Sequence, residues 1–233
     1  MSSARDRERW AVGLLLACTF ATGVVDAVGY LGLDRVFVGN MTGNVVLLGM
    51  AVAGGGDLPV LGPGAALLGF LLGAALGGRA LRHRPAGWSG RVSALLLGTG
   101  VVFLAVTVGL ATAGVEVVGP RDAGDGPPWL PAVTTALAVA MGVQAAAARH
   151  VVVPDLTTVV VTSTLTGLAA DSRPGGGSSL RWRRRAGAVL VLVTGAAIGT
   201  LLLRLHLAAG PGLAGGVLVG VAVAGHRWSQ RPG

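Results

Sequence analysis

Residues 11–33 read AVGLLLACTFATGVVDAVGYLGL, a run in which Asp26 is the only charged side chain. An α-helix needs about 20 apolar residues to cross the hydrocarbon core of a bilayer. The run is too long to be the apolar part of a signal peptide, which has about 7–15 residues. We therefore interpret it as a first transmembrane helix that the protein retains.

Seven further apolar segments follow along the chain. Their approximate bounds are residues 36–54, 60–79, 92–118, 130–149, 155–170, 186–207 and 211–227. Only 12% of the 233 residues are charged, whereas soluble domains average about 25%. The 40 glycines have no three-residue period, which excludes collagen. The sequence thus predicts an all-α protein, a polytopic bundle of membrane helices.

All 18 basic residues are Arg, and the formal net charge is +8. Such an excess can indicate a nucleic-acid-binding protein. Here the Arg residues lie between the apolar segments, and aromatic residues for base stacking make up only 4% of the chain. We expect the lipid bilayer to be the partner, and no nucleic acid.

Two of the eight segments are doubtful as crossings. The segment 36–54 opens with the polar stretch NMTGN at residues 40–44, and the segment 155–170 is short and rich in Thr. If all eight segments cross, 11 of the 18 Arg residues lie on the side of the N-terminus. If each of these two segments enters and leaves the membrane on the same side, 15 of the 18 Arg residues lie on the side of the N-terminus. Since cytoplasmic loops are rich in Arg, we favour six spans with both termini cytoplasmic, plus two short re-entrant or broken helices.

Three short stretches of the first half recur in order in the second half. The matching pairs are 23–27 with 142–146, 41–44 with 161–164, and 73–77 with 195–199, at offsets of 119, 120 and 122. This pattern indicates an internal duplication. The predicted division is 1–118 for the first membrane repeat, 119–129 for a linker and 130–233 for the second repeat. Three crossings in each repeat predict inverted repeats, which recur in transporters, whereas eight crossings predict parallel repeats.

Asp26 is the only acidic residue well inside an apolar segment. An ionised carboxylate there costs several kcal/mol unless it is paired or hydrated. One interpretation is a site for a proton, a cation or a ligand. The other is a structural hydrogen bond to a neighbouring helix or to the polar stretch 40–44.

The polar stretch precedes an apolar run, 45–53, of about half the thickness of a bilayer. We expect Asn44 to cap this run, so that its free N–H groups and positive dipole end favour an anion or a carboxylate. Capping without a ligand is the alternative. Together with the matching positions of the second half, the candidate substrate-binding or ion-binding residues are Asp26, Asn40, Thr42, Asn44, Gln144, Thr162 and Thr164.

Several glycines are spaced four residues apart, which lets helix backbones approach closely. They are Gly69, Gly73 and Gly77, then Gly195 and Gly199, then Gly212, Gly216 and Gly220. These positions predict helix packing, either within one chain or between copies in a homo-oligomer.

No catalytic motif is present, and no two of the four His residues have metal-ligand spacing on one helix. Cys18 is the only cysteine, so no intrachain disulfide can form. We expect no enzyme, no metal and no cofactor.

The stretch 23–33 followed by VFVGNMTGN at 36–44 resembles a signature of the YoaK-like family of bacterial integral membrane proteins, a domain of unknown function. Residues 141–144 and the Thr-rich stretch 157–166 are similar to a second signature, although the family usually has Asn at position 145 and Gly at position 163. The resemblance implies six spans, a place in the inner membrane and no established activity.

Three observations favour a transporter of a small solute or ion: the duplication, the distribution of Arg, and the carboxylate of Asp26 inside an apolar segment. Asp26 would be the titrating group of this transporter. The alternative is a non-transporting membrane scaffold or sensor that acts through partners. An intramembrane enzyme would need a second catalytic group near Asp26, and none is evident in the sequence.

Overall fold

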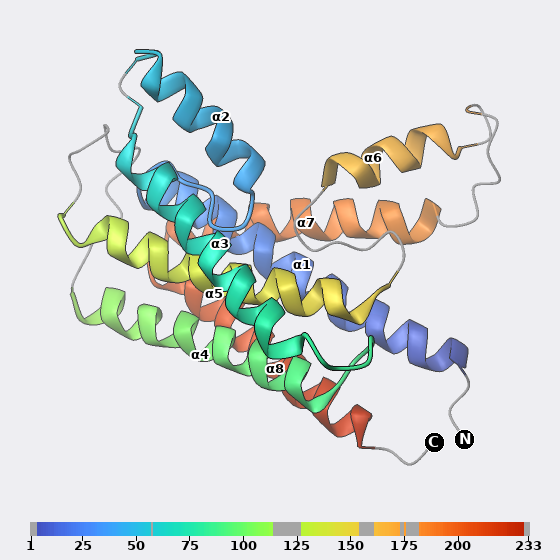
Figure 1. Ribbon diagram of the computed structural model, residues 1–233. Coiled ribbons are helices and arrows are strands. Elements are labelled where there is room, and N and C mark those ends of the chain that lie inside the picture. The colour runs from blue at the N-terminus through green and yellow to red at the C-terminus, as the bar shows by residue number, and fades with distance from the viewer. Residues whose placement is uncertain are drawn as a thin grey trace.

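A computed structural model describes residues 4–56, 58–113, 127–153, 161–172, 175 and 182–230. These residues form eight α-helices and, within those ranges, no strand (Figure 1). The helices are α1 (Ala4–Gly32), α2 (Met41–Val52), α3 (Leu61–Leu81), α4 (Gly90–Thr112), α5 (Leu130–Val151), α6 (Val161–Ala170), α7 (Trp182–Leu203) and α8 (Ala209–Ser229). The prediction of an all-α protein is confirmed.

Six of these helices are long and apolar enough to cross a membrane, namely α1, α3, α4, α5, α7 and α8. Helices α2 and α6 have only 12 and 10 residues. At 1.5 Å per residue they extend about 18 Å and 15 Å, well short of the roughly 30 Å hydrocarbon core. The described part of the chain therefore has six candidate spans and two short helices, as predicted; part of the predicted segment 155–170 lies outside the described residues.

Two predicted segments do not coincide with the helices found in them. In the segment 36–54, α2 begins only at Met41. The chain leaves the helical conformation after α1, where Arg35 has a φ of 50°, and stays non-helical up to residue 40. Helix α7 ends at Leu203 and is followed by a turn, in which the backbone N–H of Ala208 donates to Nδ1 of His206 at 3.0 Å.

The central helices of the bundle are α1 and α5. In the most apolar 18-residue stretch of each, about half is buried inside the protein, 56% and 50%, against 28% for α4 and 22% for α7. Helix α3 packs along α5 and α7 packs along α1, while α4 and α8 pack on each other (Figure 1). The short helices lie outside this arrangement, α2 against α3 and α6 against α7.

Glycines lie where the most closely packed helices meet. A Cβ atom at Gly73 would collide with the carbonyl of Val139 on α5, and one at Gly142 with the carbonyl of Phe70 on α3. Gly69 and Gly77 also face α5, with Thr135 and Val143 as neighbours.

The pair of α1 and α7 has the same construction. A Cβ atom at Gly195 would collide with the carbonyl of Phe20, one at Gly23 with that of Leu192, and one at Gly199 would lie 3.0 Å from Cα of Val24. The third set of glycines spaced four residues apart, on α8, is different, because Gly216 and Gly220 face open space.

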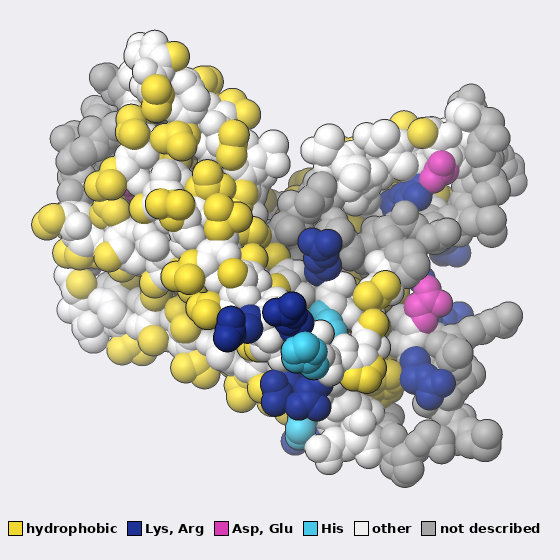
Figure 2. Space-filling view, viewed as in Figure 1, with side chains coloured by type: hydrophobic (Ala, Val, Ile, Leu, Met, Phe, Trp, Pro, Cys, Tyr) yellow, Lys and Arg dark blue, Asp and Glu magenta, His cyan; other side chains and the backbone are white. Residues whose placement is uncertain are grey.

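The start of α1 lies close to the end of α8 (Figure 1). Trp10 at the start of α1 stacks on Trp228 near the end of α8, with ring centroids 6.1 Å apart. Arg184 at the start of α7 pairs with Glu8 at 2.6 Å. The end of the bundle where α1 begins and α8 ends carries several Arg and His side chains, next to an extensive apolar surface (Figure 2).

Candidate functional site

Asp26 is on α1 and faces residues 33–40, the non-helical segment that leads into α2. Its Oδ1 atom accepts hydrogen bonds from the backbone N–H groups of Gly39 at 2.6 Å and Asn40 at 3.3 Å. The backbone N–H of Val38 interacts with the same carboxylate. Backbone donors stabilise a carboxylate where water is scarce. The structure therefore places the carboxylate of Asp26 against three successive amides just before α2.

Asn40, and not Asn44, caps α2. Its side-chain oxygen accepts a hydrogen bond from the N–H of Gly43 at 3.3 Å. Asn44 is buried, with its Oδ1 accepting from the N–H of Phe37 at 2.9 Å and its Nδ2 donating to the carbonyl of Phe37 at 2.6 Å. The expectation that Asn44 is the cap was wrong, because α2 begins at Met41 and Asn44 lies one turn inside it.

We expect Asn44→Leu to destabilise the protein, because it leaves the N–H and the carbonyl of Phe37 without their partner. An unpaired buried polar group costs roughly 1–3 kcal/mol. Thr42→Ala is the matched control, since Thr42 is exposed on the same helix. Thermal unfolding in detergent measures both variants, and equal stabilities would contradict the bracing role of Asn44.

Gln144 on α5 is fully buried and reaches α1. Its Nε2 donates to Oγ1 of Thr22 at 3.1 Å, and the hydroxyl of Thr22 donates to the carbonyl of Cys18 at 3.0 Å. Its Oε1 is buried and has no hydrogen-bond partner in the described part of the chain. Turning the amide over would leave its nitrogen unpartnered instead. Gln144 is therefore the one described side chain with an unused polar group in the interior.

Gly39 marks the point where α1, α5 and the segment before α2 meet. A Cβ atom built there would lie 3.0 Å from Cε of Met141, 3.0 Å from Cγ2 of Thr22 and 3.5 Å from Oδ1 of Asp26. Thr22, the partner of Gln144, is thus next to the segment that holds Asp26. Sequence analysis missed Thr22, although it lies one helical turn before Asp26 on the same face.

The structure gathers some of the predicted site residues and separates others. Asp26, Asn40 and Gln144 lie around the junction at Gly39, and Asn44 braces the segment behind it. Thr42 is exposed on α2. Thr162 is exposed and Thr164 is buried on α6, a helix that among the described helices packs only against α7. The two Thr residues are therefore not part of this junction.

The fold is a bundle of six apolar spans with two short helices. Backbone amides just before α2 hold a carboxylate. Together these features define a multi-pass membrane protein. The chain belongs to the family described as "Protein of unknown function (DUF1275)", which it matches over residues 14–224. This finding confirms the resemblance noted from the sequence.

A curated relative is the UPF0700 transmembrane protein YoaK of Bacillus subtilis (strain 168). The two chains are 31% identical over 160 residues, which are 68% of this chain and 65% of that protein. The match thus spans somewhat less than two thirds of the relative. No solved structure matches this chain significantly.

Proposed function

We propose that the protein transports a small solute or ion, and that its binding site lies at the junction of Asp26, Asn40 and Gln144. The observation that carries this proposal is a carboxylate inside a candidate span, one helical turn from Thr22, which bonds a buried amide that has an unused polar atom. Ionisable groups in membrane spans are costly and mark ion and substrate pathways. Asp26 is half-buried, at the edge of the packed interior.

The helix contacts support a second part of the proposal, two inverted repeats. In this comparison α1, α2, α3 and α4 correspond to α5, α6, α7 and α8. The contact of α3 with α5 then corresponds to the contact of α7 with α1. In the same way α1 with α8 becomes α5 with α4, and α2 with α3 becomes α6 with α7. Each repeat would cross the membrane three times, so the two would have opposite orientations. Rocking of one inverted repeat against the other is a common route to alternating access.

We place the protein in the bacterial inner membrane with both termini in the cytoplasm. Six crossings bring the two ends of the chain to one side of the membrane, and Figure 1 shows the start of α1 and the end of α8 at the same end of the bundle. The loop after α3, which holds Arg82 and Arg84, and the end of α5 with Arg149 lie at that end too. This clustering agrees with the excess of Arg in cytoplasmic loops.

Asp26→Asn in proteoliposomes tests the transport proposal. Asn keeps the size of the side chain and an oxygen that can accept from Gly39, so the variant removes the charge and keeps the fold. Proton or cation entry is measured with a pH-sensitive or ion-sensitive dye inside the vesicles at several external pH values. We expect flux to fall about tenfold or more, and its pH dependence to disappear.

Asp34→Asn is the control for this experiment, because Asp34 is an acidic residue just beyond the end of α1 and outside the span. It should leave flux unchanged. Unchanged flux with unchanged pH dependence in Asp26→Asn would refute the role of Asp26. If the unmodified protein moves neither protons nor cations and retains a stable partner protein through purification, the scaffold alternative holds instead.

A further inference from the structure

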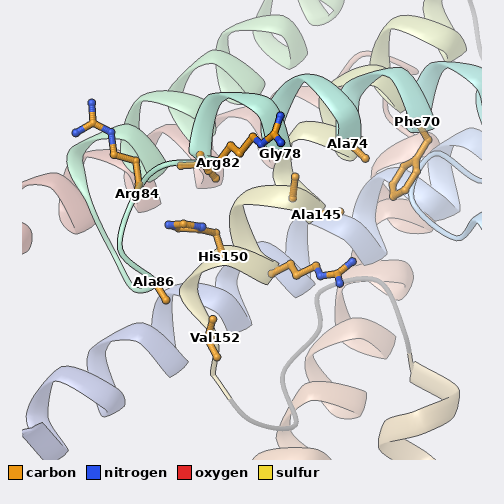
Figure 3. A pocket seen from close by; sticks show the side chains of 12 residues that line it. Phe70, Ala74, Gly78, Arg82, Arg84, Ala86, Ala145, His150 and Val152 are labelled. Carbon is orange, nitrogen blue, oxygen red and sulfur yellow. The ribbon is translucent and has the colours of Figure 1, made fainter.

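A second site lies away from the junction of α1 and α5, at the end of the bundle where α1 begins and α8 ends. A cavity of about 880 Å³ opens there between α3 and α5 (Figure 3). Phe70, Ala74 and Gly78 of α3 form an apolar wall, which Ala145 and Ala146 of α5 complete. The cavity therefore has an apolar interior that runs along the spans.

The mouth of the cavity is basic. Arg82 and Arg84 line it from the loop after α3, and Arg149 and His150 line it from the last turn of α5. The three Arg side chains have no ion pair or side-chain hydrogen bond with any residue that the structure describes, unlike Arg184 and Arg185, which are paired with Glu8 and Asp171. Cations that line one cavity and have no protein counter-ion favour an anionic ligand.

The mouth is also held in place. Nε2 of His150 makes a hydrogen bond of 2.9 Å with the carbonyl of Pro85, and the N–H of Gly87 donates to the carbonyl of His150 at 3.1 Å. Gly87 has a φ of 117°, a conformation that other residues rarely adopt. The loop after α3 is therefore fastened to the end of α5, and Figure 3 shows His150 between that loop and the helix.

We propose that this cavity binds an anionic phospholipid, with its phosphate at the basic mouth and one acyl chain along the apolar wall. Guanidinium groups match the geometry of phosphate oxygens. Basic pockets between transmembrane helices bind anionic headgroups, and this one lies at the ends of the spans, where headgroups are found. A free phosphate would satisfy the Arg side chains but leave the apolar wall without a ligand. The proposal does not depend on transport.

Native mass spectrometry of the purified protein in detergent tests this site. Phosphatidylglycerol, phosphatidylcholine with the same acyl chains, and inorganic phosphate are added separately. We expect one phosphatidylglycerol to bind about tenfold more tightly than phosphatidylcholine, and millimolar inorganic phosphate not to displace it. Equal binding of the two lipids, or complete displacement by phosphate, would overturn the proposal.

Two kinds of variant locate the binding. Arg82→Gln combined with Arg149→Gln should weaken phosphatidylglycerol about tenfold or more, whereas Arg79→Gln, at an exposed position of α3 that does not line the cavity, should not. Gly78→Phe should weaken the lipid by filling the apolar wall without changing the charge. Equal losses in Arg79→Gln and the double variant would show general attraction to basic surface and refute a built site. Circular dichroism confirms that each variant is folded.

Discussion

Gly142→Leu is expected to separate α3 from α5 and to destabilise the whole bundle. A Cβ atom at Gly142 would collide with the carbonyl of Phe70 and lie 2.7 Å from the amide nitrogen of Ala74. Backbone atoms within a helix cannot rotate away as a side chain can, so the two helices must move apart along their contact. We expect a loss of at least the roughly 1–3 kcal/mol that overpacked cores show. Gly73→Leu should behave in the same way, because its Cβ would meet the carbonyl of Val139.

Gly98→Leu is the matched control, since Gly98 lies in the middle of α4 and faces open space. It should be as stable as the unmodified protein or slightly more stable, because Leu favours helix more than Gly does. Thermal unfolding in detergent and size-exclusion chromatography compare the variants. If Gly142→Leu and Gly98→Leu unfold at the same temperature, the close approach of α3 and α5 is wrong. Gly195→Leu extends the test to α1 and α7.

Single cysteines in a Cys18→Ala background are expected to label in an all-or-none pattern. His83→Cys in the loop after α3 and Arg183→Cys at the start of α7 should resist a membrane-impermeant maleimide in intact spheroplasts and react once the membrane is permeabilised. Ala53→Cys at the end of α2 should react at once. The three positions are exposed in the structure, so a protected cysteine is protected by the membrane. The physical basis is that, with six crossings, the loops beside α2 and the loop that holds His83 lie on opposite sides of the membrane.

The controls for this labelling are the unmodified protein, whose only cysteine is buried, and the Cys18→Ala protein, which has none. Labelling of His83→Cys from outside would refute six crossings with a cytoplasmic N-terminus. If all three positions are labelled from the same side of the membrane, α3 does not cross the membrane between Ala53 and His83.

The spans could be predicted from the sequence because a bilayer imposes a length and a composition on each one. The start of α2 could not be predicted in the same way. Asn40 and Asn44 have the same side chain and similar surroundings in the sequence, and the choice between them depends on Phe37, which engages both the acceptor and the donor of the Asn44 amide.

Contacts between distant parts of the chain were also beyond sequence reasoning. The hydrogen bond from Gln144 to Thr22 joins residues 122 positions apart, so the pairing becomes visible only when α5 lies beside α1. The basic cavity has the same origin. Arg82 and Arg149 each look like an ordinary loop or helix-end residue, and they form one site because α3 and α5 end side by side.

The pairing of α3 with α5 and of α7 with α1 has a consequence for how the protein is made. The third helix of each half has its main packing surface on the first helix of the other half. When α3 leaves the ribosome, the segment that will cover Gly73 has not yet been translated. The packing surface of α3 therefore stays uncovered until α5 has been translated, and that of α1 until α7 has been translated.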